Sequence, residues 1–307
     1  MKVPKGFQIT GENSKDYVLK LNRNVYGQKQ ASRVWNKFLE EKLINEAGFK
    51  KSKVDDCVFY KNKTMYMLYT DDSILAGPDK NEIDQIIKDI QNTGLNITRE
   101  GDIKDFLGIN IKKLKEGSIE FTQPHLIDQI LNDLKMDKDK VKTKSIPCMV
   151  SKVLNSGQND EPFDNSFHYR SIIGKLNYLE KGTRSDISYI KYQCARFTSN
   201  QKSNHAKAIH WIARYLKGTR KKGFVMKRDP TKGLEVYVDA DFSGNWSMED
   251  AINQDSARSQ HGYIIKYMNC PVTWKSQLQH EIALSNTESE NTGLSYALRE
   301  AIPIMNL

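Results

Sequence analysis

The apolar positions of residues 31–76 change from helical to strand periodicity partway along the segment. Helical spacing predicts a helix that ends at Gly48. One face of this helix carries Val34, Trp35, Phe38, Leu39, Leu43 and Ala47. The runs DDCVFYKN and TMYMLYT then alternate around the tripeptide KNK, and this pattern predicts a β-hairpin. The run DSILAGP predicts a further short strand that ends at Gly77.

Helical periodicity returns after this strand and dominates the middle of the chain. An amphipathic helix is predicted from Asn81, its expected N-cap, with Ile83, Ile86, Ile87 and Ile90 turned inward. Residues 121–136 and 169–182 predict further helices, and helical segments continue to about Gly218. The polar stretch 151–164, SKVLNSGQNDEPFD, is the best candidate for a linker.

The last part of the chain returns to strand periodicity. From Leu234, the segments GLEVYVDADF, SQHGYIIKYMNCPVTWKS and EIALSN predict three strands in a row, and residues 287–305 predict a closing helix. The chain therefore has a mixed first part, a helical middle and a strand-rich last part. Together they predict a mixed α/β (α+β) fold class.

Two adjacent carboxylates, Asp71 and Asp72, follow the strand that ends at Tyr69. Neighbouring like charges between apolar strands repel each other and lose hydration, so a cation would stabilise them. Hard oxygen ligands this close together suit Mg²⁺, which binds through one or two carboxylates and substrate phosphates. A polar hairpin turn is the alternative, because Asp-Asp is common at hairpin tips.

The charge balance favours a polyanionic partner. The 307 residues include 47 Lys and Arg against 38 Asp and Glu, a formal net charge of +9. Ten Lys or Arg but one acid, Asp229, fall within residues 201–232. On a helix predicted over residues 204–218, an apolar face consists of Ile209, Ile212, Ala213 and Leu216. The opposite face carries Lys207, His210, Arg214 and Lys217.

This basic stripe fits the phosphate backbone of a nucleic-acid duplex, which rewards charge without regard to base sequence. A solvated helix face is the alternative. Trp211 and Tyr215 border the stripe, where they contact either sugar and base or a neighbouring helix.

Other composition features exclude several classes of protein. The four cysteines are far apart and form no C-x-x-C pair, which favours free thiols over a zinc site or a disulfide scaffold. The six histidines show no metal-ligand spacing. The start of the chain, MKVPKGFQIT, has no apolar core of signal-peptide length, and no run approaches the ~18 apolar residues of a membrane helix. The chain is therefore expected to be soluble and intracellular, not secreted.

An ordered series of motifs resembles the reverse transcriptase of copia-type LTR retrotransposons. The segments LKLNRNVYGQKQASRVW, GFKKSKVDD and YTDD correspond, in that order, to the family patterns L-x-K-x-L-Y-G-L-K-Q-A-x-R-x-W, G-F-x-x-S-x-x-D and Y-V-D-D. FLGINI, FTQPHLIDQIL, YRSIIGKLNYLEKGTRSDISY and HAKAIHWIARYLKGT continue the resemblance. The segment from VYVDADFSG to TESE resembles the family's RNase H domain. Nearly the whole chain is covered.

The resemblance implies roles in the polymerase for three groups of residues. Asp71 and Asp72 match the second metal-binding motif of the palm, which holds Mg²⁺ (or Mn²⁺) ions that bridge nucleotide phosphates and activate the primer 3′ hydroxyl. The motif that lies along template and nucleotide corresponds to Gly27, Lys29 and Gln30. The hairpin that grips the primer end corresponds to Phe106, Leu107 and Gly108. Core packing is the alternative role for Phe106 and Leu107.

In the RNase H part, Asp239 and Asp241 alternate along a predicted strand and so point to one face, while Glu288 and Glu290 begin the closing helix. The family's site takes the first Asp and the second Glu as metal ligands, which implies Asp239 and Glu290 here. Asp241 and Glu288 are then expected at the surface or beside the ligands.

The resemblance also implies a domain order and partners. Residues 1–112 correspond to partial fingers and palm, 113–232 to a basic helical thumb and connection, and 233–307 to a truncated RNase H-like sheet-and-helix domain. The implied partners are an RNA template, an RNA–DNA hybrid and deoxynucleoside triphosphates, with no membrane. The implied location is cytoplasmic and particle-associated, or nuclear.

Both metal sites are expected to be incomplete. The family's D-V-x-x-A-F motif, which supplies another palm Asp, is not found in residues 1–64, and the third RNase H carboxylate of the family follows the closing helix. The isolated chain is therefore expected to make little or no DNA, and to leave a sheet edge unpaired near MYMLYT. The alternatives are a non-enzymatic nucleic-acid-binding remnant of a decayed element, and a stand-alone ribonuclease that uses Asp239 and Glu290.

Overall fold

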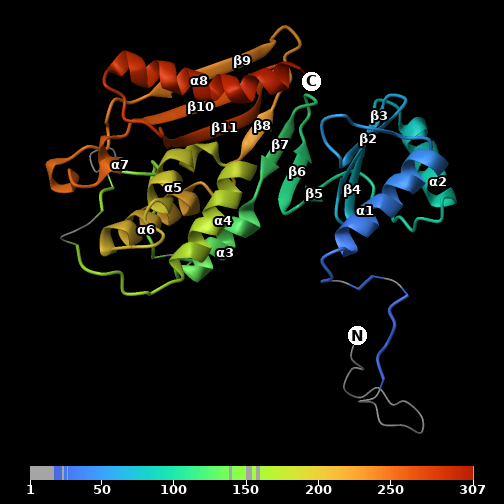
Figure 1. Cartoon of the computed structure of the whole chain (residues 1–307), viewed down its shortest axis with the longest axis horizontal. Helices are drawn as coiled ribbons and strands as arrows, with labels where there is room; N and C mark the ends of the chain where they lie inside the picture. The colour runs from blue at the N-terminus through green and yellow to red at the C-terminus, as the bar shows by residue number, and fades with distance from the viewer. Residues whose placement is uncertain are drawn as a thin grey trace. The chain divides into compact units, whose positions relative to one another are not determined.

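The computed structural model describes residues 17–22, 24, 25, 27–137, 140–149, 154–156 and 160–306. The chain divides into two compact units between Asp102 and Ile103. Figure 1 shows the helices and the three antiparallel sheets of these residues, which confirm a mixed α/β chain. The three-part division by function that the sequence suggests stays a prediction.

The first unit packs two helices against one face of a four-stranded antiparallel sheet. Its elements are α1 (Ala31–Glu41), the π-helical turn η2 (Lys42–Glu46), β1 (Lys50–Lys51), β2 (Val58–Lys61), β3 (Thr64–Tyr69), β4 (Asp72–Ala76) and α2 (Lys80–Asn92). The strand order is β1-β2-β3-β4. The core joins Leu43 of η2 and Ile86 and Ile90 of α2 to Phe59 and Tyr66 of the sheet.

The predicted hairpin and the strand after it are confirmed as β2, β3 and β4. The described sheet does have an edge near MYMLYT, but the edge strand is β4, since β3 itself is paired on both sides. The N-cap of α2 is Asp79, not Asn81, since the Asp79 carboxylate accepts a hydrogen bond from the Asn81 backbone N–H at 2.8 Å.

The predicted inward face of α1 is confirmed only in its last part. Leu39, Leu43 and Ala47 are buried, and Gly48 has the positive φ of 75° that ends the helical run. The earlier apolar positions are 45–47% exposed: Val34, Trp35 and Phe38. The prediction fails for them because the core is built on the last turn of α1 and on η2.

The second unit begins with a sheet assembled from distant parts of the chain. It contains β5 (Asp105–Phe106), β6 (Ile109–Lys113), β7 (Ile119–Thr122) and β8 (Phe224–Met226), in that order. Phe121 and Thr122 therefore belong to β7, and the helix predicted from residue 121 begins only at Pro124. Proline favours the first turn of a helix, because its missing N–H has no partner to lose there.

The helical middle forms the largest core of the described residues. Its helices are α3 (Pro124–Asp133), α4 (Tyr169–Gly182), the 3₁₀ turn η3 (Ser185–Ile187), α5 (Ser188–Ala195) and α6 (Ser203–Gly218). The predicted linker 151–164 is not a free spacer where it is described, since Leu154 and Phe163 are buried in this core. Residues 150–153 and 157–159 lie outside the described residues.

The last sheet consists of β9 (Leu234–Ala240), β10 (Gln260–Tyr267) and β11 (Cys270–Leu278). The connection from β9 to β10 contains η4 (Met248–Asp250) and α7 (Gln254–Ala257). The closing helix α8 (Asn286–Met305) lies along one face of this sheet, with α5 on the other side (Figure 1). SQHGYIIKYMNCPVTWKS is a hairpin rather than one strand, because Met268 and Asn269 turn with positive φ. EIALSN is not a strand, so that prediction is wrong.

Candidate functional site

Asp71 and Asp72 lie at the tip of the hairpin formed by β3 and β4. Tyr69 pairs with Asp72, so Thr70 and Asp71 form a two-residue turn. Both carboxylate residues are exposed. Thr70 has a φ of 56°, a left-handed conformation that is a genuine outlier for a β-branched residue. The predicted strand–turn–strand setting of the two carboxylates is confirmed.

The register places Asp72 on the sheet face that the helices do not cover. Phe59, Tyr66 and Leu75 point into the core beneath α1 and α2. Because side chains alternate along a strand, Asp72 shares the opposite face with Ile74. The first unit therefore presents a carboxylate at the edge of an open sheet face.

The predicted template- and nucleotide-binding residues lie in the same unit, at the start of α1. Gly27, Lys29 and Gln30 are exposed, Gly27 has a φ of 91°, and Gln30 occupies the N-cap position. Backbone N–H groups at a helix N-terminus favour anions. Arg23 and Tyr26 of the same motif lie outside the described residues.

The FLG segment is a tight turn in the second unit. Phe106 pairs with Ile109, which leaves Leu107 and Gly108 as a two-residue turn between β5 and β6. Both turn residues have positive φ, 53° and 71°. Phe106 and Leu107 are half-buried and Gly108 is exposed.

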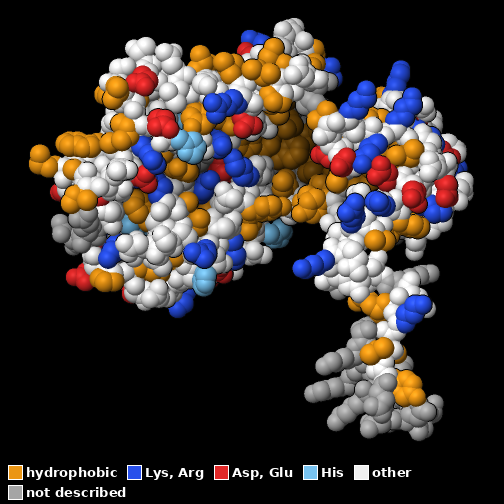
Figure 2. Space-filling view, viewed as in Figure 1, with side chains coloured by type: hydrophobic (Ala, Val, Ile, Leu, Met, Phe, Trp, Pro, Cys, Tyr) orange, Lys and Arg blue, Asp and Glu red, His pale blue; other side chains and the backbone are white. Residues whose placement is uncertain are grey.

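The basic helix is present as α6, and its predicted apolar face is confirmed by Ile209, Ile212, Ala213 and Leu216, all at most 1% exposed. Of its predicted basic residues, Lys207 is exposed. Arg214 Nε donates to the Lys142 carbonyl at 2.6 Å. Figure 2 shows Lys and Arg side chains spread among other types over the visible face of this unit rather than in one band.

The aromatic residues and the last lysine of α6 also contact the protein. The Trp211 indole donates to the Ile146 carbonyl at 3.0 Å, and Lys217 Nζ donates to the Met136 carbonyl at 3.4 Å. Tyr215 is 4% exposed. Tyr215 is therefore packed inside the protein rather than available to sugar or base. The segment between α3 and α4 covers part of the helix face that was expected to meet phosphates.

Asp239 lies on the strand face away from α8. Val236 and Val238 pack against α8, so the alternating Asp239 points to the other side of the sheet. Glu290 is exposed on α8. Ser289 Oγ donates to the Asp241 carbonyl, which holds the start of α8 against the end of β9. The two candidate ligands are thus carried by elements that touch, but at opposite faces of the strand.

Glu288 has a capping role. The Glu288 backbone N–H donates to Ser285 Oγ at 3.1 Å, and its carboxylate accepts from the Leu284 N–H at 2.8 Å. This reciprocal arrangement satisfies the first turn of α8. Glu288 therefore lies at the surface, as the sequence suggests.

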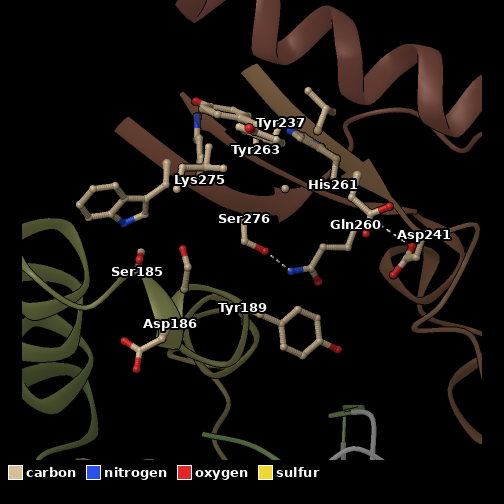
Figure 3. Close-up of a pocket in the computed structure, with 16 residues that line it drawn as sticks. Ser185, Asp186, Tyr189, Tyr237, Asp241, Gln260, His261, Tyr263, Lys275 and Ser276 are labelled. Carbon is tan, nitrogen blue, oxygen red and sulfur yellow. Dashed lines mark hydrogen bonds between the residues drawn. The ribbon is translucent and has the colours of Figure 1, made fainter. Parts of the chain in front are cut away.

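Asp239 and Asp241 line a cavity of about 520 Å³ between the β9–β11 sheet and α5. Figure 3 shows Asp186 and Tyr189 across it from Gln260, whose amide donates to Ser276 Oγ at 2.7 Å. Burial raises the pKa of Asp186, but hydrogen bonds from Arg184 and Tyr215 outweigh it, so the pKa lies below its usual value. The cavity was missed from sequence because no local pattern brings η3 and α5 to this sheet.

Metal ligation is the weakest part of the predicted sites. Among residues the structure describes, no group of three or more His, Cys, Asp or Glu side chains could hold a metal ion. Two adjacent exposed carboxylates, Asp71 and Asp72, are a donor set that fits a hard divalent cation in part.

No described helix is long and apolar enough to cross a membrane.

Comparison with known proteins identifies the family. Residues 1–150 match the family described as Reverse transcriptase (RNA-dependent DNA polymerase). Across 98% of its length the chain is 29% identical to the retrovirus-related Pol polyprotein from transposon TNT 1-94 of Nicotiana tabacum. Across 94% it is 30% identical to the corresponding polyprotein from transposon RE1 of Arabidopsis thaliana. The chain belongs to the copia-type reverse transcriptase family.

The chain spans 22% and 19% of the lengths of these two polyproteins. A relative of similar extent is the putative transposon Ty5-1 protein of Saccharomyces cerevisiae, which is 28% identical over 98% of this chain and 94% of its own length. No solved structure matches the chain.

Proposed function

We propose that the chain contributes the palm, thumb and RNase H parts of an RNA-directed DNA polymerase encoded by a copia-type retrotransposon. The observation that carries the proposal is the Asp71–Asp72 pair on a tight turn at the edge of an open sheet face. The pairing of β3 with β4 fixes the backbone of both aspartates, while the helices of this unit cover the opposite sheet face. Within the first unit, the sheet face that the helices leave uncovered gives a nucleic-acid strand a route to the carboxylates.

In this proposal Asp71 and Asp72 bind divalent cations together with the nucleotide phosphates. A Mg²⁺ or Mn²⁺ ion there would neutralise phosphate charge and favour ionisation of the primer 3′ hydroxyl. Gly27, Lys29 and Gln30 contact template and nucleotide from the start of α1. Leu107 and Gly108 support the primer end, and Lys207, Arg214 and Lys217 remain candidates for backbone contacts.

Asp239 and Glu290 form the RNase H half of the proposal. Asp239 at the cavity wall and exposed Glu290 supply carboxylates for cleavage of the RNA strand in an RNA–DNA hybrid. Because they lie at opposite faces of β9, bound hybrid and metal would have to draw them together around the end of the strand. We therefore expect this chain alone to bind the hybrid but to cleave its RNA strand only weakly.

Metal binding at Asp71 and Asp72 tests the proposal directly. The double variant D71N/D72N should weaken Mn²⁺ binding, measured by water-proton relaxation, at least about tenfold, because it removes both hard anionic ligands. The matched control is D55N/D56N, an adjacent and exposed aspartate pair in the same unit, and it should bind Mn²⁺ as the unaltered chain does. Equal Mn²⁺ binding by the two double variants would contradict the polymerase assignment.

Primer extension on an RNA template then separates catalysis from binding. We expect the chain to bind a primer–template in a salt-sensitive way. We expect little or no primer extension, because neither proposed metal site has three carboxylates among the described residues. Mg²⁺-dependent extension that D71N abolishes would support the polymerase role and overturn the expected inactivity. Binding without turnover, unaffected by D71N/D72N, would favour a non-enzymatic nucleic-acid-binding remnant.

A further inference from the structure

The turn between β5 and β6 has a conformation that its first residue does not favour. Leu107 and Gly108 both have positive φ, as a type I′ turn requires. Gly108 meets this requirement without strain, and asparagine is the usual partner before it. Leucine has a branched side chain and no local hydrogen bond to offer, so the left-handed conformation of Leu107 must be held by other contacts.

One such contact comes from α4. The Tyr178 hydroxyl donates a hydrogen bond to the Leu107 carbonyl oxygen at 2.5 Å. Tyr178 is 49% exposed, so burial does not explain its position on α4. The helix that carries it is fixed by buried neighbours on either side, Leu176 and Leu179, which are at most 1% exposed. The phenol thus reaches from a rigid helix to the carbonyl of the strained residue.

We propose that Tyr178 is a positioning residue that locks the Leu107–Gly108 turn in its left-handed conformation and so sets the primer end for extension. This inference rests on the proposed function, since it takes the turn as the primer-contacting hairpin. Tyr178 acts through the backbone of Leu107 and does not itself touch the reacting atoms. The left-handed conformation of Leu107 is strained, so it persists only while the hydrogen bond from Tyr178 holds it.

The first test measures the turn without nucleic acid. Amide hydrogen exchange in the full chain should show the Ile109 N–H, which faces Phe106 across the turn, exchanging about fivefold faster in Y178F than in the unaltered chain. The control is Y267F, because Tyr267 is also 49% exposed and lies on the β10–β11 hairpin. Unchanged exchange at Ile109 in Y178F would overturn the proposal.

A second variant distinguishes a lock on the turn from a general effect on α4. Asn-Gly is the preferred pair of a type I′ turn, so L107N should restore slow exchange at Ile109 in the Y178F background. Failure of L107N/Y178F to recover protection would mean that Tyr178 acts on something other than the turn conformation, and would also overturn the proposal.

The final readout concerns the primer. A hybrid with a recessed primer 3′ end and a blunt hybrid of equal length are bound by each variant, and the ratio of the two dissociation constants is measured. The ratio should fall toward one in Y178F and stay unchanged in Y267F. If exchange changes as expected but the unaltered chain shows no preference for the recessed end, the lock stands and the primer-contacting function fails. A retained preference in Y178F would overturn the link between lock and primer.

Discussion

At the residue scale, two of the residues with positive φ lie in the turns that the polymerase proposal singles out, and others, such as Lys135, Ser243 and Met268, lie elsewhere. Thr70 precedes Asp71 with a φ of 56°, and Leu107 opens the FLG turn with a φ of 53°. Asparagine is the residue that tolerates this region best after glycine, and it is found there at Asn62 in the neighbouring β2–β3 turn. The β-branched Thr70 is the least expected residue in this region, and its strain is a quantity that substitution can measure.

Exchanging the residues of two neighbouring turns tests how much strain Thr70 stores. T70N should raise the free energy of unfolding by about 1 kcal/mol, because asparagine relieves the clash of the β-branched side chain. The reciprocal variant N62T should lower it by a similar amount, since Asn62 has a φ of 53°. Urea denaturation of both variants measures the two changes. A destabilised T70N would show that the Thr70 side chain makes a contact worth more than the strain.

At the scale of elements, the sequence pattern predicted the helices and hairpins that neighbouring residues form. The helix α4 has the bounds that the sequence indicates, and the β2–β3 hairpin and the closing helix are present. The β5–β8 sheet was not foreseen, because its last strand, Phe224–Met226, pairs with a strand about a hundred residues earlier. Its short apolar run carries no signal of that partner.

An ion pair between a buried arginine and a partly exposed aspartate beside the cavity fixes η3 against α6. Arg184, 1% exposed, binds Asp186 through two hydrogen bonds of 2.9 Å and donates to the Thr219 carbonyl at 3.2 Å. R184K should lower the free energy of unfolding by about 2–4 kcal/mol, because lysine cannot make the two-pronged contact and leaves partly buried acceptors unsatisfied.

The second unit supplies a matched control for this prediction. Arg220 also binds an aspartate, Asp128, with two nitrogens, but its side chain is 47% exposed. R220K should therefore cost less than about 1 kcal/mol, since water replaces most of what is lost. Urea unfolding of both variants gives the comparison. Equal losses would mean that burial does not decide the strength of these pairs.

At the scale of the whole molecule, the candidate sites were only partly predictable. Asp71 and Asp72 are neighbours in sequence, so their shared turn followed from the strand pattern. Asp239 and Glu290 come from a strand and a helix, and only the packing of α8 shows that they lie at opposite faces of β9. Ligand sets assembled from distant elements depend on such packing, which the local pattern does not encode.

The two units should respond differently to acid. All six histidines of the chain follow Ile103 and so belong to the second unit. His261 is 1% exposed and its ring stacks on Tyr296 with 4.5 Å between ring centroids. Burial, with smaller contributions from Lys275 and His280, lowers the pKa of His261 to about 4. The folded unit therefore keeps this imidazole neutral at a pH at which the unfolded chain protonates it.

A lowered histidine pKa makes stability fall as the pH falls. Above the ordinary histidine pKa of about 6.5 the imidazole is neutral in both states and adds no pH dependence. Between about 6.5 and about 4 the unfolded chain binds a proton that the folded chain does not, so the free energy of unfolding declines by up to about 1.4 kcal/mol per pH unit. H261Q should make this slope shallower in urea unfolding of the second unit, while His205 and His210, whose pKa burial also lowers, keep part of it. H125Q, which alters an exposed histidine, should retain the full slope. Parallel pH profiles for H261Q and the unaltered chain would show that other groups, such as Asp186, set the acid limit.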